Sequence, residues 1–408
     1  MRVLLSTIGS RGDVQPLVAL ALQLRKLGQD VHLCAPPDFR EWVEGLGISI
    51  TPIGPELRKM TVASVAPTPT PLSPETLRQM TEAMIASQFK TITEAAQGCD
   101  LILGATGLQV ATRSVAEQLG VPYFFTAFCP AVLPSPHHAP PVYGVRGQVP
   151  ALATADNRDL WARDAAVFNE SFAATLNSHR AGIGLPPVGD VRDHIFTGHP
   201  WLAADPILAP WPDPSDQAVF QTGAWILPDE RPLSPGLEAF IEAGEPPIYF
   251  GFGSSRAPQG LSQVMVQTAR ALGRRALISA GWAGLSLVDN EPDCLAIGEV
   301  NQQTLFKRVA AVVHHGGAGT TTAAARAGAP QVIIPQGFDQ HYWARRVQTL
   351  GIGTAHAPGT STTDSLTRAL KHTLRPDAAA RAKSIAAAMR GDGAEIAARR
   401  LIDAAPQN

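Results

Sequence analysis

Short apolar runs alternate with longer segments of helical periodicity through the first part of the chain. The apolar runs that predict buried strands cover residues 2–6, 31–35, 101–104 and 121–126. Between the first two runs, Leu and Ala repeat at helical spacing in a segment that opens at Pro16 and stops at Gly28. Proline near the start and glycine past the end are typical of a helix. Strands that alternate with helices in this way predict a parallel sheet.

The second part of the chain repeats this alternation. Its strand-like runs cover residues 247–251, 276–279, 294–297, 310–314 and 331–334. A proline-dense segment at residues 200–235 separates the two series and is typical of a linker. We therefore predict an α/β fold with two tandem Rossmann-like domains that face a cleft. The predicted parts are a first domain, a linker, a second domain and a C-terminal helix that packs back on the first domain, at residues 1–205, 206–225, 226–385 and 386–408.

The composition narrows the class of protein. With 408 residues the chain exceeds the usual size of a single core, which agrees with two domains. The net charge of −2 and the lack of a basic cluster argue against a nucleic-acid partner. The four cysteines lie far apart, which predicts neither a zinc site nor a disulfide framework. Because the sequence shows no signal-peptide pattern and no membrane-spanning apolar run, we expect a soluble, cytoplasmic protein and a monomer.

A turn rich in His and Gly occupies residues 314–320, between an apolar run and a helical segment. Glycine amides and a helix N-terminus that face one point bind phosphate groups. We predict that the imidazole of His315 donates to an anionic oxygen there. The other residues expected around the phosphate are Gly317, Gly319 and Thr320. A buried structural histidine is the alternative for His315, and it is favoured for His314, whose side chain alternates to the opposite side of the strand.

Asp339 and Gln340 follow the last strand-like run, at the edge of an open α/β sheet where ligands bind. A carboxylate can accept hydrogen bonds from two sugar hydroxyls, and an amide can both donate and accept. The alternative is that the pair caps a helix predicted at residues 341–350. Together with the phosphate turn, the pair predicts a nucleotide sugar as ligand.

Asp13 lies in the glycine-containing turn at residues 9–16 that follows the first strand. A carboxylate at a helix N-terminus in the interdomain cleft can accept a proton from an acceptor hydroxyl, which makes Asp13 a candidate general base. A helix cap is the alternative, and the local sequence alone favours it. The turn lacks the G-x-G-x-x-G pattern, so a nicotinamide cofactor is not indicated.

Three further candidates follow predicted strands of the second domain. Ser254 comes after the first of these strands and is expected to face the diphosphate, with a plain tight turn as the alternative. Trp282 and Val300 follow the next two strands and are candidates to flank a nucleobase. For Trp282, packing in the core is an equal alternative.

Taken together, these motifs resemble the family 1 glycosyltransferases of two-domain GT-B architecture. The resemblance is strongest to the bacterial enzymes that glycosylate glycopeptide-antibiotic aglycones, and the enzymes that act on sterols and on macrolides or other polyketides are nearly as similar. It covers nearly the whole chain. The segments that carry it are residues 9–16, 177–180, 184–187, 221–225, 251–254, 314–320 and 335–340.

The resemblance implies a role for each candidate. Asp13 corresponds to the general base, His315 and its turn to the phosphate site, and Ser254 to a serine facing the diphosphate. The pair Asp339 and Gln340 corresponds to the sugar-binding pair. The residues that we also expect on the donor side are Ser10 and Arg11, and those expected to contact the acceptor are Phe128, His137 and His138.

The chain departs from the plant members of the family at the nucleobase. Glu299 stands where those enzymes have a base-stacking tryptophan, so uracil and thymine both stay open. The expected acceptor loops, residues 55–80 and 130–160, match no relative closely enough to name the aglycone.

The activity implied by the resemblance is that of an inverting hexosyltransferase that needs neither a metal nor another cofactor. It would move a hexose from UDP-glucose or a TDP-sugar to a hydroxyl of a hydrophobic or polycyclic natural-product aglycone. A glycopeptide-like acceptor is favoured, with a sterol or a polyketide as alternatives. A nucleotide-sugar epimerase and a catalytically silent partner of another transferase are further alternatives. Contact with a membrane surface is expected only if the acceptor is a lipid.

Overall fold

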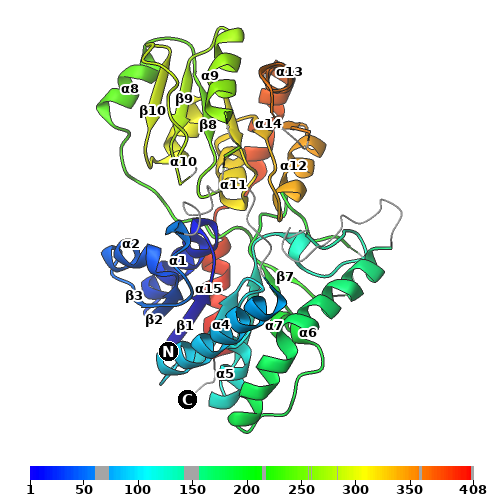
Figure 1. The fold of residues 1–408 in the computed structure, drawn as a ribbon. Helices are drawn as coiled ribbons and strands as arrows, with labels where there is room; N and C mark the ends of the chain where they lie inside the picture. Colours follow the sequence, from blue (N-terminus) through cyan, green and yellow to red (C-terminus); the bar gives the residue numbers. More distant parts are fainter. Residues whose placement is uncertain are drawn as a thin grey trace.

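Two parallel sheets, each flanked by helices, form the lower and upper halves of the molecule in Figure 1. The computed structural model describes the chain apart from residues 60–72, 142–155, 214–216, 256, 259, 283, 358–360 and 406–408. Parts of both expected acceptor loops therefore lie outside the described residues. The predicted fold class, two tandem Rossmann-like domains, is confirmed.

The first sheet has seven parallel strands in the order β3-β2-β1-β4-β5-β6-β7. Its strands are β1 (Arg2–Thr7), β2 (Asp30–Ala35), β3 (Ser49–Pro52), β4 (Leu101–Ala105), β5 (Tyr123–Ala127), β6 (Trp201–Leu202) and β7 (Phe220–Gln221). The helices of this half are α1 (Arg11–Lys26), η1 (Pro37–Phe39), α2 (Arg40–Gly45), α4 (Pro74–Ala95), α5 (Thr112–Leu119), η2 (Pro130–Val132), α6 (Asn157–Gly182) and α7 (Val191–Phe196). The central strands β1 and β4 are almost wholly buried, as expected of a parallel sheet that helices cover on both faces.

The second sheet has six parallel strands in the order β10-β9-β8-β11-β12-β13. Its strands are β8 (Ile248–Gly251), β9 (Ala276–Ser279), β10 (Cys294–Ile297), β11 (Ala311–His314), β12 (Gln331–Ile333) and β13 (Gly353–Ala355). The helices that follow β7 are α8 (Pro235–Glu242), α9 (Leu261–Ala271), α10 (Gln302–Leu305), η3 (Phe306–Arg308), α11 (Ala318–Ala327), α12 (Gln340–Thr349), α13 (Thr363–Thr373), α14 (Pro376–Ala388) and α15 (Gly393–Ala404).

The last helix, α15, crosses back to the first half and packs against α1. Its residues Ala397 and Leu401 are fully buried in the same core as Val3 of β1 and Leu17 of α1. The strand β7 lies inside the segment predicted as a linker, yet it pairs with β6 in the first sheet. The domain boundaries themselves stay a prediction.

Each sheet has a point at which its strand order reverses, between β1 and β4 in the first and between β8 and β11 in the second. Ligands of open α/β sheets bind outside the carboxyl ends of the strands at such points. The turns after β1, β8 and β11, which carry most of the candidate residues, all start at these points. Among the described helices, none is long and apolar enough to cross a bilayer.

Candidate functional site

A cavity of about 2640 Å³ lies between the two sheets and is lined by residues of both. This volume exceeds that of a typical small-molecule pocket, about 300 to 1,000 Å³, and leaves room for two ligands side by side. The candidate residues that line it are Ser10, Arg11, Asp13, Phe128, Ser254, Trp282, Val300, His315, Gly317, Gly319, Thr320, Asp339 and Gln340.

The turn after β11 is shaped by glycines that no larger residue can replace. Gly316 has a φ of +98°, and a Cβ there would lie 2.6 Å from Ile333 Cγ2. A Cβ on Gly317, the N-cap of α11, would lie 2.6 Å from Nε2 of His315. The imidazole therefore packs directly on the start of the helix, and the free backbone amides of α11 open toward the same place.

The surroundings of the His315 side chain favour the binding of an oxygen atom. Only 9% of the residue is exposed, and its Nδ1 atom is buried without a hydrogen-bond partner among the described residues. Burial lowers the pKa of His315 to about 4, so the imidazole is neutral in the free protein. A buried nitrogen without a partner costs free energy, and an anionic oxygen bound at this turn would remove that cost.

The turns after β8 and β9 are locked to each other. Gly253, with a φ of +56°, accepts a hydrogen bond of 2.8 Å from the amide of Trp282 through its carbonyl oxygen. A Cβ on Gly281 would lie 2.4 Å from that oxygen. Ser254 thereby lies at the cavity edge, and the Trp282 ring stacks on Phe39 of the first half with centroids 6.0 Å apart. The indole thus packs across the boundary between the two halves as well as lining the cavity.

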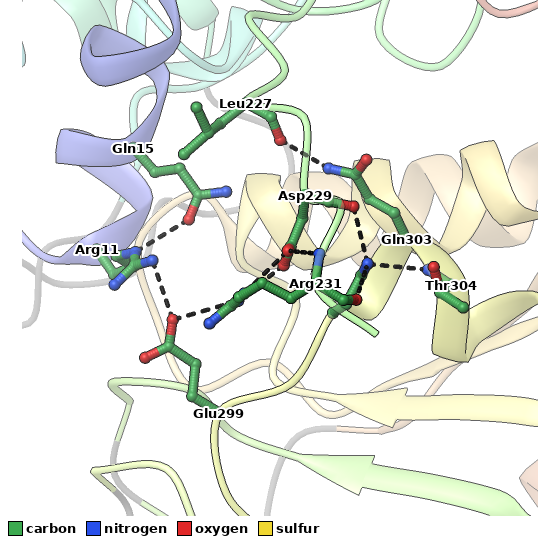
Figure 2. A network of polar contacts seen from close by, with 9 residues as sticks. Arg11, Gln15, Leu227, Asp229, Arg231, Glu299, Gln303 and Thr304 are labelled. Carbon is green, nitrogen blue, oxygen red and sulfur yellow. Dashed lines mark hydrogen bonds and ion pairs between the residues drawn. The ribbon is translucent and has the colours of Figure 1, made fainter. Parts of the chain in front are cut away.

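Figure 2 shows where the structure places Arg11. Its guanidinium donates to Gln15 at 3.0 Å and to Glu299 at 3.1 Å, and it lies over the Trp42 ring. Glu299, which follows β10, is also 3.7 Å from the guanidinium of Arg231. Arg11 therefore lines the cavity while it forms an ion pair between the two halves. Val300, next to Glu299, packs at the edge of a core cluster of the second half.

Asp13 lies at the N-terminus of α1, where its side chain takes part in the helix cap. It is the third residue of α1, and its carboxylate accepts a 2.7 Å hydrogen bond from the amide of Ser10, the N-cap. The same oxygen would be 2.2 Å from a Cβ on Gly9, so only glycine leaves room for it. Desolvation raises the pKa of Asp13 to about 6, the bond from Ser10 opposes this shift, and the charge of Asp339 adds to it. The carboxylate thus caps the helix and binds a proton more strongly than an ordinary aspartate does, while its role as general base stays a prediction.

Asp339 occupies the N-cap position of α12, but its side chain makes no capping hydrogen bond. It accepts instead from the indole of Trp343 at 2.8 Å, and burial raises the pKa of Asp339 to about 6. The Gln340 oxygen accepts from the amide of Gln336 at 2.7 Å. The helix-cap alternative thus does not describe the Asp339 side chain, which is fixed at the cavity by Trp343.

Phe338 is a cavity residue that the sequence reasoning missed. It is 52% exposed and has a φ of +53°, a left-handed conformation that is costly for an aromatic residue. A strained, exposed aromatic side chain next to Asp339 is unusual outside functional sites. No sequence signal marks it, because the segment Gln336–Asp339 has no pattern that predicts a positive φ at Phe338.

The first-half side of the cavity carries an aromatic wall, a set of phenylalanines that the sequence reasoning also missed. Its members are Phe125, Phe168, Phe172 and Phe196. The ring centroids of Phe125 and Phe196 are 4.6 Å apart, and those of Phe168 and Phe172 are 5.7 Å apart. These residues come from β5, α6 and α7, so only the fold brings them together.

Phe128 lines the cavity, but the two histidines expected to contact the acceptor do not. The ring of His138 is held at 2.9 Å from the Leu133 carbonyl and lies edge-on to Trp161 and Trp211. The amide of His137 donates to Ser135 at 3.2 Å. The described structure thus places His138 in the packing of this loop, whereas His137 is exposed, and neither residue lines the cavity.

Comparisons with known proteins agree with this geometry. Residues 3–135 match the glycosyltransferase family 28 N-terminal domain, and residues 266–399 match the erythromycin biosynthesis protein CIII-like C-terminal domain. Glycosyltransferase GtfE of Amycolatopsis orientalis is 51% identical over 98% of this chain and 96% of its own. The vancomycin aglycone glucosyltransferase of the same organism is 50% identical over 99% of this chain and 98% of its own.

The solved structure of the glycotransferase of kitacinnamycin superposes with a TM-score of 0.73 over 99% of both chains at 18% identity. At that identity the likeness shows the fold alone. The fold and the facing halves of the cavity define a GT-B enzyme. With half of its residues shared over the full length of the relatives, the chain belongs to the glycosyltransferase family of the glycopeptide-antibiotic enzymes.

Proposed function

We propose that this enzyme moves a hexose from a nucleoside diphosphate sugar to a hydroxyl of a polycyclic, glycopeptide-like aglycone, with inversion at the anomeric carbon. The observation that carries the proposal is the meeting of Asp13, from the first half, with His315 and Asp339, from the second, around one cavity. The relative named as a vancomycin aglycone glucosyltransferase supports the acceptor class.

In the proposed reaction, Asp13 accepts the proton of the acceptor hydroxyl as its oxygen attacks the anomeric carbon. The new glycosidic bond forms while the bond from that carbon to the diphosphate breaks. A single displacement inverts the centre. Asp13 suits the role because its raised pKa, about 6, makes it a stronger base than an ordinary aspartate while leaving it ionised at neutral pH.

The leaving diphosphate is stabilised by the turn after β11. The first amides of α11 point into the cavity, the helix dipole adds positive potential, and His315 supplies an N–H donor. These groups carry the stabilisation without a metal ion, so turnover is expected to persist in excess EDTA. Asp339 and Gln340 bind the sugar hydroxyls, and Trp282 with Val300 flanks the nucleobase.

The aromatic wall favours a transferase over an epimerase. An epimerase works on the nucleotide sugar alone, whereas Phe168, Phe172 and Phe196 line a second, apolar side of the cavity. Planar or polycyclic acceptors pack well against such aromatic surfaces. A sterol or a polyketide could also pack against these rings, so the test compares all three classes of acceptor.

The test incubates the purified protein with UDP-glucose or TDP-glucose and with glycopeptide, sterol and polyketide aglycones in separate reactions. Mass spectrometry should find a gain of one hexose on the glycopeptide aglycone, and NMR should show the inverted linkage. Loss of donor with a new sugar epimer and no acceptor would make the protein an epimerase instead. No turnover by the pure protein with any pair would support the silent-partner alternative. Light scattering during gel filtration tests the expected monomer.

A further inference from the structure

His314, the residue before the phosphate-site histidine, is fully buried and faces away from the cavity into a chain of three hydrogen bonds. Its Nδ1 atom is 3.1 Å from the amide nitrogen of Gly316, and its Nε2 atom is 2.9 Å from the side-chain oxygen of Gln331. The side-chain nitrogen of Gln331 is 3.3 Å from the carbonyl oxygen of Thr321. We name these four residues the His314 relay.

The two ends of the relay fix the direction of every bond in it. The Thr321 carbonyl can only accept, so the nitrogen of the Gln331 amide must face it and the oxygen must face His314. His314 must then donate from Nε2, which leaves Nδ1 without a proton. At the other end the Gly316 amide can only donate, and Nδ1 is the acceptor it requires. One tautomer of neutral His314 satisfies all three bonds.

The relay links the turn of the proposed phosphate site to α11 and to the neighbouring strand β12. Gly316 belongs to the turn itself, Gln331 is the first residue of β12, and Thr321 lies in the first turns of α11. Burial lowers the pKa of His314 to about 3, so the ring stays neutral wherever the protein is folded. A proton on Nδ1 would make this nitrogen a donor that faces the N–H donor of Gly316, so the hydrogen bond between them would be lost.

We infer that His314 is a positioning residue for donor binding, because it holds the Gly316 amide and, through it, the backbone and the His315 imidazole in the arrangement that fits a diphosphate. The inference rests on the proposed function, since it takes the turn after β11 as the diphosphate site. His314 itself touches neither the substrate nor the cavity. Its effect on catalysis is expected in the donor KM and in nucleotide affinity, with kcat at saturating donor changed much less.

The test compares two substitutions at His314. His314→Leu leaves the buried Gly316 amide without an acceptor. His314→Asn keeps one, because an asparagine oxygen can accept from the amide two residues ahead in an Asx turn. We expect His314→Leu to weaken the binding of UDP or TDP by about tenfold to a hundredfold, and His314→Asn to stay within about threefold of the wild type.

His356 supplies a matched control. It is another buried histidine of the second half, with ring nitrogens 2.8 Å from the Ala357 carbonyl and 2.9 Å from the Ser365 hydroxyl, and it does not line the cavity. His356→Leu should lower the melting temperature as His314→Leu does, while nucleotide affinity stays at the wild-type value. A general loss of packing would instead lower affinity in both variants and would overturn the assignment.

Calorimetric titration with UDP and TDP, well below each melting temperature, gives the dissociation constants. If the wild type binds neither nucleotide, the proposed function itself is wrong. If the wild type binds and His314→Leu binds equally well, only the positioning role is wrong. Should His314→Leu fail to fold, Gln331→Leu tests the same chain, because it frees His314 to adopt the tautomer that opposes the Gly316 amide. A dissociation constant for UDP or TDP that is several-fold larger in Gln331→Leu than in the wild type supports the relay, and an unchanged constant refutes it.

Discussion

The two sides of the cavity are built by different means. The proposed donor side, formed by the turns after β8 to β12, presents backbone amides, glycines and a few polar side chains, each in a short segment that directly follows a strand. The proposed acceptor side, formed by the aromatic wall, is lined by side chains from β5, α6 and α7, of which Phe125, Phe172 and Phe196 are buried. The proposed function explains this difference: phosphate is the same group in every donor, so a backbone turn can bind it, whereas aglycones differ in shape and are expected to contact side chains.

Asp13 is the proposed general base of the transfer between the two sides, so its substitution should have the largest effect on turnover. Asp13→Asn keeps the acceptor oxygen for the Ser10 amide but loses the proton acceptor. The rate at saturating substrates should fall by about 10²-fold to 10⁴-fold, with the nucleotide dissociation constant unchanged. Steady-state kinetics and calorimetry measure the two quantities. Near-normal turnover would refute the assignment of the base.

The pH dependence of Asp13 gives an independent check. Since the pKa of Asp13 is about 6 in the folded protein, kcat/KM should rise with pH between about 5 and 7. This pKa is above the ordinary aspartate value of 3.8 that applies in the unfolded chain. The contribution of Asp13 to the free energy of unfolding is therefore fully present below pH 3.8 and is lost as the pH rises through 6. Asp13→Asn should therefore raise the melting temperature more at pH 7.5 than at pH 4.

The difference between the sides also explains what the sequence could predict. The His315 turn follows from a local strand, glycine and helix pattern, and the structure brings His315 together with Asp13 and Asp339 as the motifs led us to expect. The Phe168 and Phe196 contact joins α6 to α7 and has no local signature. The same holds for β6 and β7, which are too short to show alternation, and for the ion pair between Arg11 and Glu299.

His315→Ala should affect the donor side alone. It removes one hydrogen bond to a charged oxygen, worth about 1.5 to 3 kcal/mol, so the dissociation constants of UDP and TDP should rise by about tenfold to a hundredfold. The acceptor KM should stay within twofold of the wild type, as measured with donor in excess. Equal losses for donor and acceptor would mean that the two sides are not separate.

Phe168→Ala should give the opposite result. The ring lines the cavity and packs edge-on against Phe172, so its removal takes apolar surface from the acceptor side. We expect the acceptor KM to rise about tenfold, which corresponds to about 1.4 kcal/mol of lost contact, while nucleotide affinity is unchanged. Because the ring also packs in the protein, the melting temperature of the variant must be measured with its kinetics. An unchanged acceptor KM would place the aglycone elsewhere in the cavity.

Glu299→Gln should have the smallest effect, and its direction separates two views of the ion pair that joins the sides. In the pair between Arg11 and Glu299, the glutamate is exposed and the arginine is partly buried, so solvent screens the pair and its own contribution to stability is about 0 to 1 kcal/mol. Neutralising Glu299 leaves the positive charge of Arg11 beside the cavity where an anionic donor binds. The donor KM should therefore fall by about twofold to threefold at low salt, and the difference should vanish near 0.5 M salt, where charges at this distance are screened.

Glu75→Gln, which breaks an exposed pair with Arg78 on α4, is the control and should leave the donor KM unchanged at both salt concentrations. If the pair instead held the two halves closed, Glu299→Gln would raise the KM for donor and acceptor together, and the two sides of the cavity would be linked through it.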